Sequence, residues 1–365
     1  MSEWQTFCLK DLGKIVGGAT PSTNNPKNYG NKIAWITPKD LSTLQGRYIK
    51  KGSRSISRLG FKSCSCVLLP KHAILFSSRA PIGYVAIAKK RLCTNQGFKS
   101  IIPNKKIYFE FLYYLLKYHK DNISNIGGGT TFKEVSGDTL GLFKVKIPPT
   151  YYEQQKIART LSVLDQKIEN NHKINELLHT LAYKIYEYYF KYKPKNAKLE
   201  QIIIENPKSS IMVKNAQKTQ DKYPFFTSGD NILSYPKAII DGRNCFLNTG
   251  GNAGIKFYVG KASYSTHTWC ICANEFSDYL YLLLSNIKTH INQSFFQGTS
   301  LKHLQKNLLK KYPIYMPSSH EIKKFNQIIM PLLTLISINT RTSKKLEQIR
   351  DFLLPLLLTQ QVKPQ

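Results

Sequence analysis

The second half of this 365-residue sequence repeats part of its first half at an almost constant distance. The string Gly129-Thr130-Thr131-Phe132-Lys133 returns 169 residues later as Gly298-Thr299-Ser300-Leu301-Lys302, and Glu153 returns 168 residues later as Glu321. Repetition at a fixed offset over this length indicates two equivalent structural units in one polypeptide. A pseudo-two-fold arrangement of such units can read two separate places on one ligand.

Two segments of the repeat carry the heptad spacing of a coiled-coil helix. From Glu153 to about Tyr192 the sequence lacks Gly and Pro, and its apolar residues recur in steps of three and four. A helix of this length would be about 60 Å long. The same series recurs from about Ser319 to Thr359. The predicted seam positions are Leu161, Leu164, Ile168, Asn171, Leu178, Ile185, Ile329, Leu332, Ile336, Asn339, Leu346 and Leu353.

Two long helices with the same seam can pack on each other, or each can pack on its own globular domain. Helix length favours an antiparallel coiled coil. Asn171 and Asn339 fall in the seam, where a buried amide must find a partner, so we predict that they fix the helix register.

The segments outside the two helices have the pattern of short β-strands. Apolar runs such as Ala73–Phe76 and Cys245–Asn248 are bounded by Gly, Pro and Asn. The predicted fold class is therefore α+β, with two β-rich domains related by pseudo-two-fold symmetry and two long helices. The predicted boundaries are 1–150 for the first domain, 151–193 for the first helix, 194–318 for the second domain, and 319–365 for the second helix and tail.

The net charge of +31, from 53 Lys plus Arg against 22 Asp plus Glu, indicates a polyanionic partner. Nucleic acid is the first candidate. A membrane is a poorer one, because no apolar run reaches the roughly 20 residues that span a bilayer. The N-terminus lacks the pattern of a signal peptide, so we expect a cytoplasmic protein. Seven cysteines, an odd number, fit reduced thiols, and we expect no metal site.

Several strings resemble the specificity subunit of type I restriction–modification enzymes. They include Trp35-Ile36-Thr37-Pro38-Lys39-Asp40-Leu41, Ser78-Arg79-Ala80-Pro81-Ile82-Gly83-Tyr84, Asn95-Gln96-Gly97-Phe98-Lys99 and Glu153-Gln154-Gln155-Lys156-Ile157. The resemblance covers the whole chain and is weaker from 195 to 318. The second join, Pro317-Ser318-Ser319-His320-Glu321, departs from the family pattern because it lacks the Gln-Gln pair.

This resemblance implies a division of labour. Each globular domain would be a target recognition domain that reads one half of an interrupted, asymmetric sequence in double-stranded DNA. The paired helices would set the gap between the halves and dock two methyltransferase subunits, which bind S-adenosylmethionine and methylate adenine. Motor–nuclease subunits can join that core, and ATP and Mg would bind to partner subunits.

Candidate DNA-contacting residues follow from side-chain chemistry. Lysine suits phosphate contacts, whereas base reading needs Arg, Asn, Gln, Ser or Thr on loops. The alternative for each is a solvated surface charge, and Arg79 could instead pair with a carboxylate. The candidates are Lys39, Lys50, Lys51, Arg54, Arg58, Arg79 and Gln96 in the first domain, and Lys214, Lys218, Lys222, Ser228, Arg243, Asn252 and Lys256 in the second.

The sequence offers no convincing catalytic motif. Asn25-Pro26 and Asn206-Pro207 continue with Lys, not with the Pro-aromatic pair of an adenine methyltransferase, and the Gly-rich strings do not open a phosphate-binding helix. We therefore expect a non-catalytic subunit with no cofactor of its own. Two alternatives stay open, an orphan nucleic-acid-binding protein on the same scaffold and a degenerate nuclease or methyltransferase.

Overall fold

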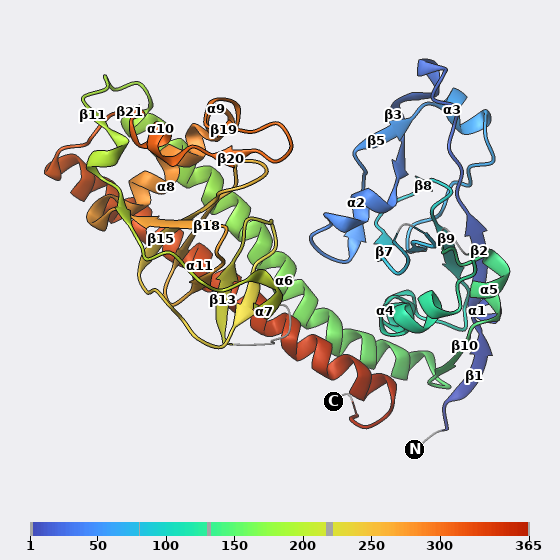
Figure 1. Cartoon of the computed structure of the whole chain (residues 1–365). Helices are drawn as coiled ribbons and strands as arrows, with labels where there is room; N and C mark the ends of the chain where they lie inside the picture. Colours follow the sequence, from blue (N-terminus) through green and yellow to red (C-terminus); the bar gives the residue numbers. More distant parts are fainter. Residues whose placement is uncertain (1–2, 80, 130–132, 217–221, 364–365) are drawn as a thin grey trace. The chain divides into compact units, whose positions relative to one another are not determined.

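The computed structural model describes residues 3–79, 81–129, 133–216 and 222–363. The chain divides into two compact units: Met1–Asn170 with Ser343–Gln365, and Asn171–Thr342. Two long helices, α6 (Tyr151–Tyr186) and α11 (Ser319–Leu358), each contribute one part to both units (Figure 1). Each unit therefore contains one β-rich domain and one stretch of both helices. Within the described ranges, every helix is too short or too polar to cross a lipid bilayer.

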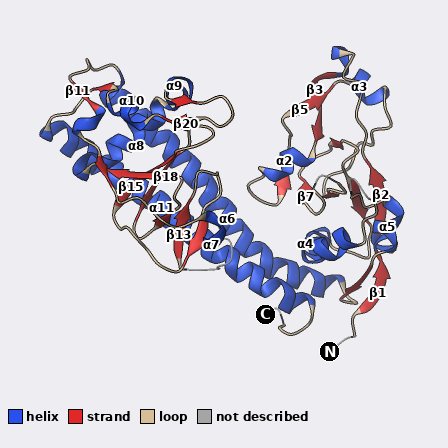
Figure 2. Ribbon diagram, in the orientation of Figure 1, coloured by secondary structure: helices blue, strands red, loops and turns tan. Residues whose placement is uncertain are grey.

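The β-rich domain of the first unit contains a five-stranded sheet and a three-stranded sheet (Figure 2). The larger sheet has the order β2-β9-β6-β7-β4 and the smaller one β5-β3-β8, and β1 pairs with β10. The strands are β1 (Gln5–Cys8), β2 (Gly13–Gly17), β3 (Tyr29–Ile36), β4 (Tyr48–Ile49), β5 (Arg54–Ile56), β6 (Ile74–Phe76), β7 (Val85–Ala88), β8 (Cys93–Thr94), β9 (Lys99–Pro103) and β10 (Lys144–Ile147). The short helices are α1 (Leu9–Leu12), η1 (Pro26–Asn28), α2 (Pro38–Ser42), α3 (Arg58–Lys62) and α5 (Gly137–Leu142).

Helix α4 (Phe109–Asn125) connects the large sheet of the first unit to the long helices. Its residues 111–116 are all buried, because one face meets the sheet and the other meets α6 and α11. Phe76 of the sheet, Leu161 of α6 and Leu357 of α11 belong to the same apolar core. The β-rich domain and its stretch of both helices therefore share one apolar core.

The second unit repeats this plan. Its sheets have the orders β12-β18-β15-β16 and β14-β13-β17, with the pairs β11-β21 and β19-β20 beside them. The strands are β11 (Ala197–Lys198), β12 (Ile204–Glu205), β13 (Tyr223–Phe226), β14 (Leu233–Tyr235), β15 (Arg243–Asn248), β16 (Ile255–Val259), β17 (Ser263–Tyr264), β18 (Thr268–Cys272), β19 (Phe296–Gln297), β20 (His303–Leu304) and β21 (Pro313–Ile314). The helical segments are the π-helical turn η2 (Glu187–Lys191), η3 (Leu199–Gln201), α7 (Val213–Ala216), η4 (Asn274–Phe276), α8 (Ser277–Asn286), α9 (Lys288–Ser294) and α10 (Lys306–Lys310).

Backbone hydrogen bonds extend the equivalence of the two units beyond the strings that repeat in the sequence. The amide of Leu9 donates to the carbonyl of Phe143, and the amide of Leu199 donates to that of Tyr312, both at 3.0 Å. Each bond closes its domain onto a strand pair, β1-β10 in one unit and β11-β21 in the other. The duplication therefore includes the region 195–318, where the sequence resemblance is weak.

The two long helices pack on each other within each unit. In the first unit, Leu161 of α6 shares a core with Leu354 near the end of α11. In the second unit, Ala182 of α6 shares a core with Phe325 near the start of α11. The helices are therefore antiparallel, as the seam predicted. Each also packs on its own domain, so the two arrangements that the sequence left open occur together.

Burial along the seam is uneven. Asn339 donates a hydrogen bond to Oδ1 of Asn175 at 2.9 Å, so its partner is one helical turn beyond the predicted Asn171. The side-chain amide of Asn175 also donates a hydrogen bond to the backbone carbonyl of Ile336 at 3.4 Å. The fully buried seam residues are Leu161, Ile168, Ile329 and Ile336. The half-buried ones are Leu164, Asn171, Leu178, Ile185, Leu332, Asn339, Leu346 and Leu353.

Two adjacent isoleucines on α11 provide a matched test of this packing. Ile329 is 0% exposed in the seam and Ile328 is 43% exposed. Ile329→Ala should lower the free energy of unfolding by about 2–5 kcal/mol because it leaves a cavity, whereas Ile328→Ala should change it by less than about 0.5 kcal/mol. Urea denaturation measures both values, and equal losses would contradict the seam assignment.

Candidate nucleic-acid interface

In the first unit, one aspartate joins helix α2 to the loop that precedes β5. Asp40 Oδ2 accepts hydrogen bonds from the amide (2.8 Å) and hydroxyl (2.7 Å) of Thr37, and Oδ1 accepts one from the amide of Ser53 (2.7 Å). Burial opposes ionisation of Asp40, but these hydrogen bonds lower its pKa overall. The joined segments carry four of the predicted DNA-contacting residues, all exposed: Lys39, Lys50, Lys51 and Arg54.

A second loop, residues 95–97, packs against the start of α2. The amide of Asn95 donates to the carbonyl of Ile36 at 2.9 Å. A Cβ on Gly97 would lie 3.0 Å from Cγ of Pro38, so a larger residue there would push Pro38 away by a few tenths of an ångström. Gln96 is exposed between them and accepts a hydrogen bond from the hydroxyl of Thr20. Residues 37–40, 50–54 and 95–97 thus come together, and we call them the first loop cluster.

Of the other two predicted arginines of the first unit, Arg79 lies beside this cluster. The carbonyl of Gly97 accepts a hydrogen bond from the amide of Ser78 (2.8 Å), which places Arg79 next to the loop. Arg79 also approaches Glu134 at 3.6 Å, and its side chain is 38% exposed. The carboxylate partner that the sequence left open is therefore present, and a partly exposed pair of this kind adds little stability. Arg58 is exposed at the first position of α3.

The second unit contains an equivalent loop cluster. Both backbone bonds that hold the 95–97 loop recur: Ser265 donates to the carbonyl of Phe226 (2.9 Å), and Thr249 donates to that of His267 (3.2 Å). We call residues 226–229, 248–254 and 265–268 the second loop cluster. Ser228, which donates to the carbonyl of His267, and the exposed Asn252 belong to it.

Lys256 has a role inside the second loop cluster. Its ammonium group donates to the carbonyl of Thr227 (2.8 Å) and to Oδ1 of Asn248 (3.3 Å), and burial lowers its pKa. The two acceptors belong to different segments of the cluster, so Lys256 holds these segments together. Lys214 on α7 and Lys222 before β13 are exposed, whereas Lys218 lies outside the described residues.

Arg243 lies at the opposite end of β15 from the second loop cluster. Its Nε and Nη2 atoms contact the carboxylate of Asp278, both at 2.5 Å, and Nη1 donates to Oγ1 of Thr334 on α11 (2.9 Å). Asp278 is buried, and an unpaired charge there would be costly. The guanidinium group is thus used within the unit, away from the second loop cluster.

Three exposed basic residues near the clusters are not among the DNA-contacting residues predicted from the sequence. His267 lies in the second loop cluster, and Lys302 is held beside it, because its carbonyl accepts a hydrogen bond from the amide of Gly251 (2.9 Å). Lys133 occupies the position in the first unit that matches Lys302, 169 residues earlier. The sequence did contain a signal for the two lysines, since each ends the repeated Gly-Thr string.

In the described part of the chain, no group of three or more side chains that could bind a metal ion occurs.

A second row of apolar residues lies on the exposed side of the long helices. In the second unit it contains Ile174, Leu177 (71% exposed) and Leu181 on α6, Tyr188 (86% exposed) on the adjoining turn η2, and Ile328, Leu335 and Ile338 on α11. In the first unit the exposed members are Val163, Ile349 and Phe352. We call these residues the outer stripe. Heptad spacing of exposed apolar residues is typical of a helix surface that binds another helix.

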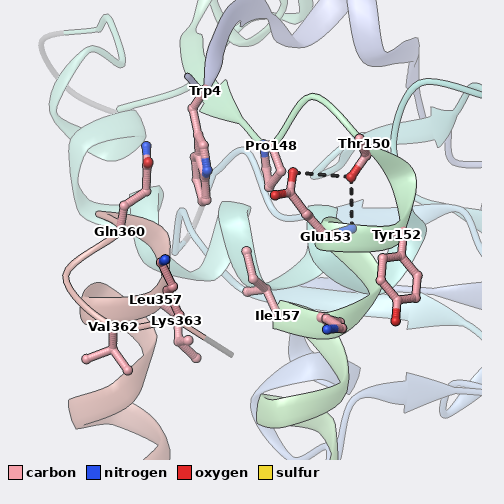
Figure 3. A pocket seen from close by; sticks show the side chains of 11 residues that line it. Trp4, Pro148, Thr150, Tyr152, Glu153, Ile157, Leu357, Gln360, Val362 and Lys363 are labelled. Atoms are coloured by element: carbon pink, nitrogen blue, oxygen red, sulfur yellow. Dashed lines mark hydrogen bonds between the residues drawn. The ribbon is translucent and has the colours of Figure 1, made fainter. Parts of the chain in front are cut away.

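The first unit contains an open cavity of about 470 Å³ (Figure 3). Trp4, Ile157 and Leu357 are among the side chains that line it. The matching residues in the second unit are aromatic, since Tyr189 replaces Leu357 and Phe325 replaces Ile157 at an offset of 168. Those two rings pack edge to face, with centroids 6.0 Å apart.

Comparisons with known proteins agree with the duplicated architecture. A family model described as the type I restriction modification DNA specificity domain matches twice, at residues 1–180 and 195–348. The MjaIX type I restriction enzyme specificity subunit of Methanocaldococcus jannaschii is 34% identical, over 98% of this chain and 93% of the relative. The HindI specificity subunit of Haemophilus influenzae is 31% identical, over 46% of this chain and 38% of its own length.

A solved structure has the same fold. The S subunit of a type I restriction-modification system from M. genitalium superimposes with a TM-score of 0.64 at 18% identity, over 98% of this chain and 96% of the other. With two matches to the family model and a full-length relative, the chain belongs to the family of type I restriction–modification specificity subunits.

The loop clusters lead to a prediction about salt dependence. Replacing Lys50 and Lys51 with Gln should reduce the slope of log K against log salt for DNA binding by about 2, because each lost phosphate contact removes about 0.9. The control replaces Lys144 and Lys146 of β10 with Gln, which removes the same charge outside the clusters. Binding would be measured by fluorescence anisotropy. Equal slopes for the two double variants would contradict the assignment.

Proposed function

We propose that this chain is the specificity subunit of a type I restriction–modification complex. It binds double-stranded DNA through its two loop clusters, each of which reads one half of an interrupted target, and directs adenine methylation and restriction by its partner subunits. The observation that carries the proposal is the presence of two equivalent loop clusters, held by the same backbone hydrogen bonds, in one chain of this family.

The charge distribution supports binding to a DNA backbone. The chain carries a net charge of +31, and the first loop cluster exposes Lys39, Lys50, Lys51 and Arg54 together. Clustered lysines supply the non-specific, salt-dependent part of the affinity. Gln96 in the first cluster and Asn252 in the second provide the amide groups that can pair with base edges.

The outer stripe is the proposed docking surface for two methyltransferase subunits. Its apolar residues repeat at heptad positions on both long helices, so each helix offers a surface to a helical segment of a partner. The partners would supply S-adenosylmethionine binding and the methyl transfer, and motor–nuclease subunits would use ATP and Mg. The chain itself would carry no catalytic group and no cofactor, and would work in the cytoplasm.

Methylation mapping tests the proposed function. The methyltransferase subunit from the same cell would be expressed with and without this chain in a host that lacks adenine methylation, and modified adenines would be mapped by single-molecule sequencing. We expect one interrupted two-part motif that disappears when this chain is omitted. A complex that forms without modifying DNA would contradict the proposal and favour an orphan nucleic-acid-binding protein.

A single substitution tests the docking surface. Leu177→Glu should abolish binding of the methyltransferase subunit, because it places a charge in an interface that must become dry, while the exposed site tolerates Glu in the free chain. Glu176→Gln, at the neighbouring exposed position, is the matched control and should bind normally. Size-exclusion chromatography of the mixture measures assembly. Normal assembly of the Leu177→Glu variant would contradict the docking surface.

A further inference from the structure

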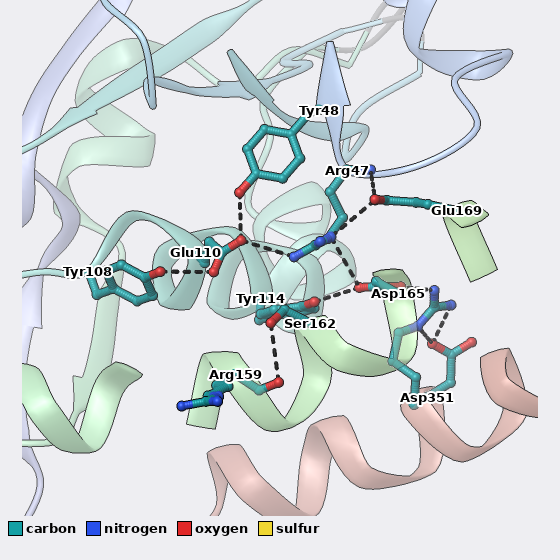
Figure 4. Close-up of polar contacts among 11 residues, drawn as sticks. Arg47, Tyr48, Tyr108, Glu110, Tyr114, Arg159, Ser162, Asp165, Glu169 and Asp351 are labelled. Atoms are coloured by element: carbon teal, nitrogen blue, oxygen red, sulfur yellow. Dashed lines mark hydrogen bonds and ion pairs between the residues drawn. The ribbon is translucent and has the colours of Figure 1, made fainter. Parts of the chain in front are cut away.

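In the first unit, the recognition domain is bonded to α6 through a buried arginine (Figure 4). The amide of Arg47, just before β4, donates to Oε1 of Glu169 on α6 at 2.9 Å, and its Nε donates to the same oxygen at 3.1 Å. Its Nη1 donates to Oε1 of Glu110 on α4 at 3.0 Å. Arg47 is 2% exposed, so one side chain ties the domain to two helices away from solvent.

The same polar network reaches the second long helix. Asp165, one turn before Glu169 on α6, accepts hydrogen bonds from the hydroxyl of Tyr114 (2.5 Å) and from Nη1 of Arg350 on α11 (2.6 Å). Burial disfavours the charge of Arg350, but the carboxylate of Asp165 raises its pKa overall. Networks of this kind have directional bonds, so they define one geometry where apolar packing alone would allow small shifts.

In the second unit, the domain is bonded to the matching position of the other long helix. Ser337 lies 168 residues after Glu169, and its hydroxyl accepts a hydrogen bond from the amide of Val259 at 3.0 Å. Arg341, one turn later on α11, donates to the carbonyl of Val259 at 3.0 Å. The two domains therefore use different segments, but both segments bond to the same position of the repeated helix.

A glycine with positive φ lies next to the bonded amide in both units. Gly46 (φ +118°) precedes Arg47, and Gly260 (φ +123°) follows Val259. A Cβ would lie 2.9 Å from Cγ of Glu169 at the first glycine, and 2.7 Å from Nη1 of Arg341 at the second. The positive φ favours glycine at both positions, and a larger residue would also press against the side chain of Glu169 or Arg341.

We propose that Glu169 and Ser337 are positioning residues that fix each recognition domain on its long helix and so determine how strictly the complex discriminates the gap between the two half-sites. The proposal rests on the function proposed above. Changing the gap by one base pair displaces the half-sites by about 3.4 Å and rotates them by about 35° relative to each other. A stiff joint makes the complex resist this change, whereas a loosened joint lets the domain turn to follow the DNA.

The test compares DNA duplexes whose gap is the natural one, one base pair shorter or one base pair longer. The dissociation constant would be measured for the complex with the methyltransferase subunits. Glu169→Ala removes the acceptor for both bonds from Arg47, and should reduce the preference for the natural gap by about tenfold. Glu176→Ala is the matched control, because it makes the same change at an exposed position of α6.

A purely structural role would lower affinity equally for all three duplexes, so the ratio of dissociation constants separates the two explanations. Ser337→Ala, which removes the acceptor for the amide of Val259 and only slightly reduces side-chain size, decides the question if Glu169→Ala does not assemble. It should weaken gap discrimination while the complex melts within a few degrees of the wild type. Unchanged discrimination in all the variants that assemble would overturn the proposal. A wild-type complex that shows no preferred gap would instead overturn the function on which it rests.

Discussion

Burial of polar anchors at one repeated helix position is the constraint on which both units depend. A domain that packs on a helix only through apolar side chains can shift along it. A buried backbone amide needs a hydrogen-bond acceptor, so it holds the domain at one position. The backbone amide of Arg47 donates a hydrogen bond to the carboxylate of Glu169, and the backbone amide of Val259 donates one to the hydroxyl of Ser337. The sheets connect each loop cluster to the anchor of its own unit. The anchor therefore determines where the loop cluster lies relative to the long helix.

The two units satisfy this constraint with different chemistry. The first uses an ionised network in which one buried arginine meets three carboxylates, those of Glu110, Asp165 and Glu169. Such a network gains little net stability, because desolvation offsets the attraction between its charges. The second uses a serine hydroxyl for the amide and places its buried ion pair, Arg243 with Asp278, beside it. The duplication therefore kept the position of the joint and changed the groups that make it.

Much of the architecture could be predicted because its signals are local. The long helices follow from a stretch without Gly or Pro and from heptad spacing, and the duplication follows from the repeated strings. The partner of Asn339 could not be predicted, since Asn171 and Asn175 are one turn apart and only the register between helices decides. Likewise, Arg243 and Lys256 have the chemistry of DNA contacts, and their internal acceptors come from distant segments. The outer stripe has the same heptad spacing as the seam, so spacing alone does not tell which apolar row faces the other long helix.

The central claim is that each loop cluster reads one half of a two-part target. Gln96 is the sharpest probe, because it is exposed in the first loop cluster and carries an amide suited to a base edge. The measurement is a single-molecule map of methylated adenines for the Gln96→Ala variant in the assembled complex. The account predicts relaxed base preference in one half of the motif, with the other half and the gap unchanged. Altered preference in both halves, or in neither, would contradict it.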